Sequence, residues 1–268
     1  MTMSDDIDEA IDWEGREITC VGCPHQDLLS VGKCQLKRAC VHERYAKRID
    51  RFFNWNPDLA NGYIDHPHFE VRAIAAKHAD VFLLTRLLDD AEETVRWNAV
   101  MRLPQRYLLR LRSDPHREVR IRVAGRLPSA DLVPMIHDED YYVRLVVART
   151  LDPELLSLMI QDPDPVVRKV VVERIGADWL MRLAQDVEPS VRIAAAERLA
   201  PHQLPSLITD TDWRVRYEVA RRGEESCLES LMDDPDPLVR EMAESRRNAG
   251  VSDGINPASP SGEREGGG

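Results

Sequence analysis

The chain has 268 residues, of which 31 % are charged and 43 % are hydrophobic, and its formal net charge is −11. Nucleic-acid binding needs a concentrated basic face that displaces counterions, so this acidity disfavours that function and leaves open only a local basic patch. No stretch approaches the ~20 consecutive apolar residues of a membrane span, so no membrane association is expected.

Residues 1–15 are predicted to form a disordered acidic tail. Six acidic residues lie between Asp5 and Glu14. A secretory signal begins with a basic segment followed by an apolar one, which this segment does not resemble. We therefore expect the protein in the cytoplasm.

Residues 16–64 are predicted to form a small domain that contains four of the five cysteines. These are Cys20, Cys23, Cys34 and Cys40, in the spacing Cys-x2-Cys-x10-Cys-x5-Cys. Because disulfides rarely persist in a reducing compartment, the group indicates a metal site. Four thiolates can hold either a zinc ion or a [4Fe–4S] cluster. The second pair, Cys34 and Cys40, is separated by five residues, which is wider than the usual spacing of a zinc pair and favours the cluster. Zinc remains the alternative.

A helix is predicted over residues 38–53, with Cys40 near its N-terminus, where the helix dipole would stabilise a thiolate. Basic residues outnumber acidic ones here and would offset the negative charge of either centre. The basic residues are Lys33, Lys37, Arg38, Arg44, Lys47, Arg48 and Arg51, against Glu43 and Asp50. His25 and His42 are alternative ligands, but their interpretation as ordinary surface histidines is favoured.

Residues 65–249 are predicted to form eight repeats of 24 residues, because the dipeptide Val-Arg recurs at that interval without drift. The dipeptides begin at Val71, Val95, Val119, Val143, Val167, Val191, Val215 and Val239. An acidic residue usually precedes each valine by three positions and is followed by proline in three repeats. This pattern is typical of a helix N-terminus, so each helix should begin about three residues before the valine and run for about three turns.

Each repeat is predicted to contain one α-helix and one shorter helix. Val143, Val147, Ala148 and Leu151 illustrate the one-sided apolar stripe of the α-helix. A pair of apolar residues three positions apart then marks a short helix, of α or 3₁₀ type. No repeat alternates like a strand, so we expect an all-α solenoid in which neighbouring repeats bury one another's stripes. Arg48 lies 24 residues before Arg72, so the cysteine domain should also cap the N-terminal end.

The arginine that follows each valine is predicted to form a structural ladder with the acidic residues of the turns. A further group lies outside this register, between Arg102 and Arg126. Its members are Arg106, Arg110, Arg112, Arg117 and Arg122. A solvated helical face is the favoured interpretation. The alternative is a patch of Arg106, Arg110, Arg117 and Arg122 that binds an acidic partner or nucleic-acid phosphates.

The unit Asp-x-x-x-x-Val-Arg-x-x-Val-Ala-x-x-Leu-Pro, over residues 65–248, resembles the leucine-rich repeat variant family, a compact relative of HEAT and armadillo repeats. The resemblance implies a right-handed superhelix of alternating α- and 3₁₀-helices. It also implies a [4Fe–4S] cluster on Cys20, Cys23, Cys34 and Cys40. The setting it implies is bacterial and, less directly, one of nitrogen fixation. Gly223, in place of leucine, and His66, in place of the first acid, depart from the pattern.

The chain shows no Gly-rich phosphate loop, no nucleophile elbow and no His-x3-His pair, so we expect no enzyme activity. We interpret it as a binding module for a protein partner, in which the cluster caps the solenoid or senses iron or oxygen. The alternatives are an electron carrier that docks through the solenoid and a nucleic-acid binder that uses residues 102–126. Cys227 is predicted to be a packed thiol, and residues 250–268 a disordered tail.

Overall fold

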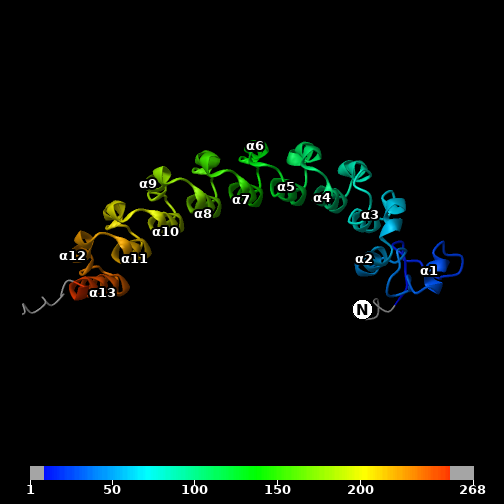
Figure 1. The fold of residues 1–268 in the computed structure, drawn as a ribbon, viewed down its shortest axis with the longest axis horizontal. Coiled ribbons are helices and arrows are strands. Elements are labelled where there is room, and N and C mark those ends of the chain that lie inside the picture. The colour runs from blue at the N-terminus through cyan, green and yellow to red at the C-terminus, as the bar shows by residue number, and fades with distance from the viewer. Residues whose placement is uncertain (1–8, 254–268) are drawn as a thin grey trace, which may run out of the picture. The chain divides into compact units, whose positions relative to one another are not determined.

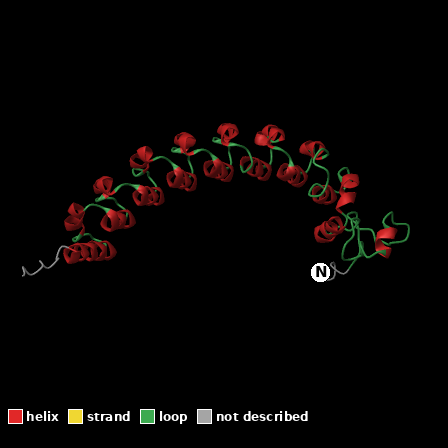
Figure 2. Ribbon diagram, viewed as in Figure 1, coloured by secondary structure: helices red, strands yellow, loops and turns green. Residues whose placement is uncertain are grey.

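The computed structural model describes the backbone of residues 9–253, which consists of α- and 3₁₀-helices joined by turns (Figure 2). Two isolated β-bridges, Ile11 with Glu17 and Gln35 with Ala39, are its only β-pairings over that range. No helix in this part of the chain is long and apolar enough to cross a membrane. The chain divides into two compact units, residues 1–151 and 152–268, which are described separately.

The N-terminal unit joins the cysteine domain to the first repeats. Successive α-helices pack on one another, α2 on α3, α3 on α4, α4 on α5 and α5 on α7, while the short helices form a second row (Figure 1). The elements are α1 (Gln26–Ser30), α2 (Ala46–Trp55), η2 (Pro57–Tyr63), α3 (Phe69–Ala75), η3 (Leu84–Asp89), α4 (Glu93–Arg102), η4 (Gln105–Tyr107), η5 (Leu109–Ser113), α5 (Arg117–Ala124), α6 (Ser129–Leu132), η6 (Val133–Met135) and α7 (Tyr141–Thr150).

The C-terminal unit continues the same alternation, with α8 packed on α10, α10 on α11 and α11 on α13. Its elements are η7 (Pro153–Met159), α8 (Pro165–Arg174), η8 (Ala177–Trp179), α9 (Leu180–Leu183), α10 (Pro189–Arg198), η9 (Pro201–Leu207), α11 (Trp213–Arg222), η10 (Glu225–Cys227), α12 (Leu228–Leu231) and α13 (Pro237–Asp253). The predicted tail from residue 250 is corrected for 250–253, which continue α13; residues 254–268 lie outside the described part.

Acidic N-caps start the repeat helices where the sequence predicts. Asp140 accepts hydrogen bonds from the backbone N–H groups of Tyr142 and Val143, and Asp164 accepts one from Val166. Both aspartates lie three residues before the repeat valine. A side chain that satisfies these otherwise unpaired donors stabilises the helix start by about 1 kcal/mol. The predicted helix boundary is therefore confirmed.

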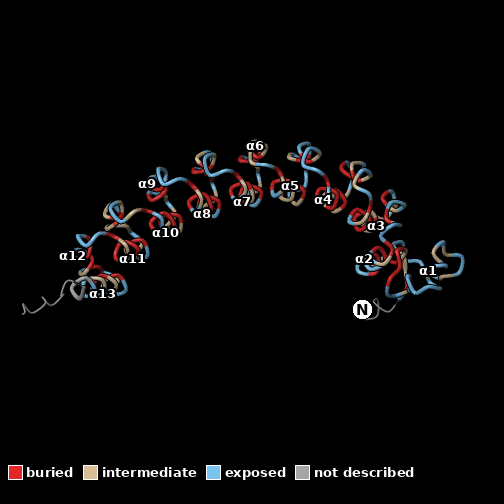
Figure 3. The backbone as a smooth tube through the Cα atoms, in the orientation of Figure 1, coloured by how far each residue is buried: buried red, intermediate tan, exposed pale blue. Residues whose placement is uncertain are grey.

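The core of each unit lies between the two kinds of helix (Figure 3). Val143, Val147 and Leu151 of the apolar stripe are fully buried, and the leucine and methionine pairs of the short helices are at most 6 % exposed. Cys227 is also buried, as predicted. A Cβ atom at Gly223 would lie 2.6 Å from the Val219 carbonyl oxygen and 3.5 Å from Cys227 Sγ, so the cysteine thiol packs where a leucine side chain would begin.

The arginine after the repeat valine joins two successive turns in six of the repeats, so the predicted ladder is confirmed. Arg96 donates from Nε and Nη2 to the two carboxylate oxygens of Asp114, both at 2.8 Å, and from Nη1 to the carbonyls of Asp90 and Ala91. The same bidentate pair across 18 residues recurs as Arg72–Asp90, Arg120–Asp138, Arg168–Asp186, Arg192–Asp210 and Arg216–Asp234. Each of these six arginines thus pairs with the acid of the following repeat.

A second arginine row points in the opposite direction along the chain. Arg222 donates to the carbonyls of Ala196 at 2.7 Å and Leu199 at 2.9 Å, at the C-terminal end of the preceding α-helix. Arg102, Arg126, Arg198 and Arg246 make equivalent contacts with the preceding repeat. Carbonyls at a helix C-terminus lack intrahelical partners, and a cation there also interacts favourably with the helix dipole.

The ladder predicts sensitivity to acid. The hydrogen bond from Arg216 is the largest cause that holds the pKa of Asp234 below its ordinary value of 3.8. For Asp90 and Asp186 burial is the largest cause and raises the pKa, but the hydrogen bonds from the paired arginine and the backbone, together with the charges of two arginines, bring the pKa below its ordinary value. A carboxyl whose pKa is lower in the folded state contributes stability that is present above about pH 4 and is lost as the pH falls through the folded value.

We therefore expect the urea midpoint of the repeat helices, followed by circular dichroism, to be lower at about pH 3 than at about pH 7. Asp234→Asn removes one of the titrating carboxylates and should show a smaller difference between the two pH values. Equal midpoints for the unaltered protein at both pH values would contradict this prediction.

Candidate metal centre

Turns, not helices, position the four cysteines. Cys20 and Cys23 lie on one tight turn, closed by the Cys23 N–H and the Cys20 carbonyl at 3.4 Å. Gly22 between them has a φ of 76°, a left-handed conformation that glycine adopts without strain. Gly32, with a φ of 71°, turns the chain after α1 and leads it back to Cys34.

The segment between Cys34 and Cys40 is fixed by a buried carboxylate. Gln35 and Ala39 exchange two backbone hydrogen bonds of 2.8 and 2.9 Å around Lys37, whose φ is 64°. The Lys37 N–H donates to the Glu43 carboxylate, which is fully buried and also pairs with Arg48 of α2. Glu43 therefore connects the loop before the fourth cysteine to the first long helix.

The four thiols are neighbours and form no disulfide. Cys34 and Cys40 are buried and hydrogen-bond with each other, whereas Cys20 and Cys23 are half-buried. Burial, followed by the nearby Cys23 and Cys20, raises the pKa of the Cys34 thiol, and burial raises the pKa of Cys40 to about 12. Among residues 9–253, no three His, Cys, Asp or Glu side chains meet in the arrangement of a single-ion site.

Backbone donors also face the sulfurs. The His25 N–H lies 3.5 Å from Cys23 Sγ, and the N–H groups of His42 and Glu43 hydrogen-bond to Cys40. Such donors stabilise thiolate charge in iron–sulfur proteins. The buried, proton-retaining thiols need a positively charged centre to become ligands, and the donors are placed to support them once they do. The residues present therefore fit a thiolate-ligated metal centre.

The predicted helix over residues 38–53 is wrong at its start. Helix α2 begins at Ala46, six residues after Cys40, because the Gln35–Ala39 turn is followed by a non-helical segment whose last residue, Tyr45, is extended. Cys40 is therefore not at a helix N-terminus. Its support comes from the turn N–H groups of His42 and Glu43, a feature that the charge pattern does not reveal.

The two histidines are half-buried and packed against other rings of the domain, so they are not ordinary surface side chains, which corrects that expectation. The His25 ring hydrogen-bonds with the Tyr63 hydroxyl. Its ring centroid lies 5.9 Å from that of His42 and 5.2 Å from that of Phe52. Burial lowers the pKa of both histidines, so they are neutral at about pH 7. The structure thus adds Tyr63 to the surroundings of the cysteines, for which the sequence carries no signal.

The domain begins earlier than residue 16. The Ile18 N–H donates to the Ala10 carbonyl at 2.9 Å, and the backbone N–H of Arg44 donates to the Ile11 carbonyl at 3.1 Å. The prediction of a disordered tail is therefore wrong for residues 9–15, while residues 1–8 lie outside the described part. The apolar Ala10 and Ile11 amid the acids explain why this segment packs.

Arg48 occupies the repeat arginine position, as predicted, and is buried in α2. It pairs with Glu43 and donates to the Glu9 carbonyl at 3.1 Å, because His66 stands where the later repeats place an aspartate. Helix α2 packs on α3, and its buried residues include Ile49, Phe52 and Phe53. The cysteine domain therefore provides the first helix of the stack.

The arginines between residues 102 and 126 do not gather into one patch. Arg106 and Arg110 lie on the short helices η4 and η5, whereas Arg117 and Arg122 lie on α5. Three of them pair with carboxylates: Arg110 with Asp89 at 2.9 Å, Arg117 with Asp140 at 2.9 Å and Arg122 with Glu118 at 2.7 Å. Arg112 donates to the Leu109 and Asp131 carbonyls. The solvated-face interpretation accounts for these contacts.

These features define a class: a helical-repeat protein that begins with a four-cysteine domain. The family model for the FeS4-cluster domain of LRV proteins matches residues 10–62, which include all four cysteines. A solved structure described as a leucine-rich repeat variant with a novel repetitive motif is 40 % identical, with a TM-score of 0.82. The match covers 85 % of this chain and 98 % of that one. The chain belongs to the leucine-rich repeat variant family.

A curated relative is described as an uncharacterized 27.7 kDa protein in the nifB 3′ region of Rhodobacter capsulatus. It is 51 % identical over 96 residues, which are 36 % of this chain. The chain spans 39 % of that relative's length. The family membership and the strand-free repeats confirm the predicted fold class and the presence of an iron–sulfur domain.

Proposed function

We propose that this iron–sulfur repeat protein is a protein-interaction module in the cytoplasm and has a binding function rather than a catalytic one. The observation that carries the proposal is structural continuity. The cysteine domain supplies α2, the first helix of the stack, and Glu43 ties that helix to the loop between Cys34 and Cys40. A centre held by the cysteines can therefore support the binding surface of the repeats or change it.

We propose a [4Fe–4S] cluster as the centre, held by Cys20, Cys23, Cys34 and Cys40, with zinc as the alternative. Four thiolates satisfy either centre, but the loose spacing of Cys34 and Cys40 suits the larger cluster. When bound, the cluster would supply a rigid crosslink among the turns and a centre sensitive to oxygen and iron supply. The protein's own residues would exclude water at Cys34 and Cys40 and leave Cys20 and Cys23 half-buried.

Electron transfer is the second candidate, and one observation favours it. Val21, between the two half-buried cysteines, is 87 % exposed, so a cluster would approach the surface on that side. A reversible couple in voltammetry would support this candidate. Nucleic-acid binding has less support, because Arg110, Arg117 and Arg122 pair with carboxylates.

We expect anaerobically purified protein to be brown and to contain about four iron and four sulfide per chain, as a cubane requires. Iron and acid-labile sulfide analysis checks this result. Colourless protein that retains one tightly bound zinc ion would contradict it.

The same preparation, immobilised with its cluster intact, tests the binding function when it is used as bait in an anaerobic extract of its native cell. We expect it to retain one or more specific proteins that a bait of the same chain denatured with urea does not retain. If the folded bait retains none, the proposed module is wrong.

A further inference from the structure

The first pair of cysteines is tied to the helix stack by a contact of its own. Glu43 and Arg48 hold the loop that carries the second pair. The turn that carries the first pair is reached by Tyr63, the last residue of η2, whose hydroxyl hydrogen-bonds with Nε2 of His25 across 38 residues of sequence. His25 lies two residues after Cys23. The contact therefore connects a helix of the stack to the half-buried side of the site.

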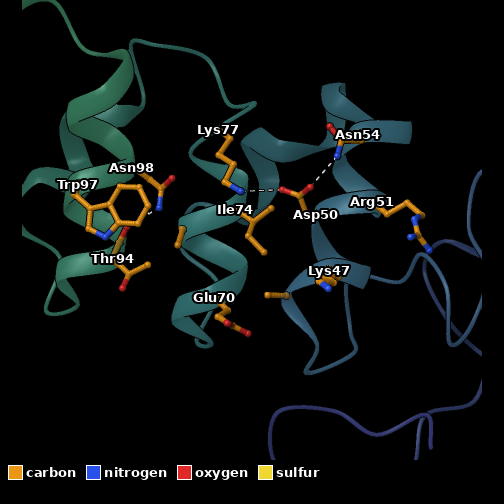
Figure 4. A pocket seen from close by; sticks show the side chains of 12 residues that line it. Lys47, Asp50, Arg51, Asn54, Glu70, Ile74, Lys77, Thr94, Trp97 and Asn98 are labelled. Carbon is orange, nitrogen blue, oxygen red and sulfur yellow. Dashed lines mark hydrogen bonds and ion pairs between the residues drawn. The ribbon is translucent and has the colours of Figure 1, made fainter. Parts of the chain in front are cut away.

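The Tyr63 ring is fixed on the core of the stack. Its centroid lies 5.5 Å from that of Phe53 and 6.5 Å from that of Phe52, in T-shaped contacts with two fully buried rings. Such edge-to-face contacts are favourable beyond the burial of area. Helix η2 packs on both α2 and α3, and Asp50 of α2 pairs with Lys77, just after α3, at 2.9 Å (Figure 4). The stack thus positions the hydroxyl.

His25 presents its backbone to the thiol of Cys23. Its N–H lies 3.5 Å from Cys23 Sγ, and its carbonyl accepts hydrogen bonds from the N–H groups of Leu28 and Leu29 at 3.1 and 3.3 Å. Hydrogen bonds to the sulfurs help to set the reduction potential of an iron–sulfur cluster. Because Tyr63 fixes the His25 ring, the hydroxyl also helps to fix the direction of this N–H donor.

Tyr63 also lies within electrostatic reach of the thiols. Burial is the largest cause that raises the pKa of Tyr63 to about 12, followed by the charges of Cys23, Cys40 and Cys34. The hydroxyl therefore keeps its proton at about pH 7 and can donate a hydrogen bond to the neutral His25 ring. A neutral donor anchored on the stack thus stands beside three of the four thiols.

We propose that Tyr63 is a positioning residue for the first pair of cysteines: through His25 it holds the Cys23 turn against the metal centre and keeps the backbone donor on the sulfur. This inference rests on the proposed thiolate-ligated centre and names the residue by which the first repeat controls how firmly that centre is held. Cys20 and Cys23 are half-buried, and Val21 between them is 87 % exposed, so this turn is the side on which the centre can open.

The test compares the anaerobically purified, cluster-containing protein with Tyr63→Phe, which keeps the ring and removes the hydroxyl. We expect the iron and sulfide content and the circular dichroism spectrum to be unchanged. Iron release to the ferrous chelator bathophenanthroline should be about fivefold faster, as the loss of one hydrogen bond permits. The reduction potential should become more negative, because a poorly directed N–H donor stabilises the added negative charge of the reduced cluster less.

The matched control is Tyr217→Phe, which removes the hydroxyl of another half-buried tyrosine, packed on Trp213, and should leave both quantities unchanged. His25→Phe removes the other partner of the hydrogen bond and keeps the backbone N–H. Because the hydroxyl acts through this ring, the double variant of Tyr63 and His25 should release iron no faster than either single variant.

Three results would overturn the proposal: equal release rates and potentials for Tyr63→Phe and the original, additive effects in the double variant, or loss of iron binding in His25→Phe, which would make His25 a ligand. The metal of the unaltered protein decides the cluster separately. If it is zinc, the proposed cluster is wrong, and the rate of zinc release to a chelator in the same variants decides the role of Tyr63. Protein that holds neither metal would refute both.

Discussion

Replacing Cys34 with alanine is expected to abolish iron and sulfide binding while most of the helical signal survives. Cys34 is buried and lies among the other three thiols. In the variant only three cysteine ligands would remain, and one iron of the cluster would lack its thiolate. The repeats bury their apolar stripes against their neighbours, and the stability of such a stack is approximately a sum of local terms. The cysteine domain contributes only α1, α2 and η2 to the helices of the described chain.

Iron analysis and far-ultraviolet circular dichroism measure the two halves of this prediction. Cys227→Ala is the matched control, because it removes another buried thiol, in η10, and should leave the iron content unchanged. Loss of most of the helical signal in the Cys34 variant would show that the cluster nucleates the repeats. Retention of the full iron content would remove Cys34 from the ligand set.

The second large effect is expected from Arg96→Ala. The Arg96 and Asp114 side chains are 9 % and 2 % exposed, so the variant leaves a buried carboxylate without its cation. It also leaves the Asp90 and Ala91 carbonyls without their donor. Removing one partner of a buried ion pair typically costs about 3–5 kcal/mol. We expect the urea midpoint of the N-terminal repeats to fall accordingly.

Arg110→Ala is the control for this measurement, because it removes the same side chain from an Arg–Asp pair that is 50 % and 77 % exposed. Exposed pairs contribute about 0–1 kcal/mol, so its midpoint should change little. Adding Asp114→Ala to Arg96→Ala should recover part of the loss, since the unpaired charge is then gone. Equal midpoints for Arg96→Ala and Arg110→Ala would reject a stabilising ladder.

The repeat fold is predictable from sequence because it is local and periodic. Val143, Val147 and Leu151 mark the buried stripe at helical spacing, and Asp140 marks the N-cap. It is harder to predict from sequence which neighbouring repeat supplies the acid that pairs with each arginine. The 24-residue register shows that Arg96 lies near an acid, but only the stacking of the turns shows that this acid is Asp114 and not Asp90.

The cysteine domain is harder to predict because its structure depends on single long-range contacts. The spacing identifies the four cysteines, whereas the path between Cys34 and Cys40 depends on Lys37 in a left-handed conformation and on the buried Glu43. Neither residue shows this role in its sequence context. The helix predicted from residue 38 is wrong for this reason, and the contact of Tyr63 with His25 could be found only after η2 was placed.

The arginine contacts have a consequence for how such a gene can change in length. Within each unit, the first arginine reaches a carboxylate 18 residues ahead and the second reaches carbonyls 26 or 23 residues behind, at the same offsets from one repeat to the next. Deleting or duplicating 24 codons inside a unit gives every surviving arginine an equivalent partner, whereas an insertion of any other length leaves buried charges unpaired at the junction. Mutation can therefore lengthen or shorten the stack within a unit only in whole repeats of 24 residues, because its own ion pairs set the size of each step.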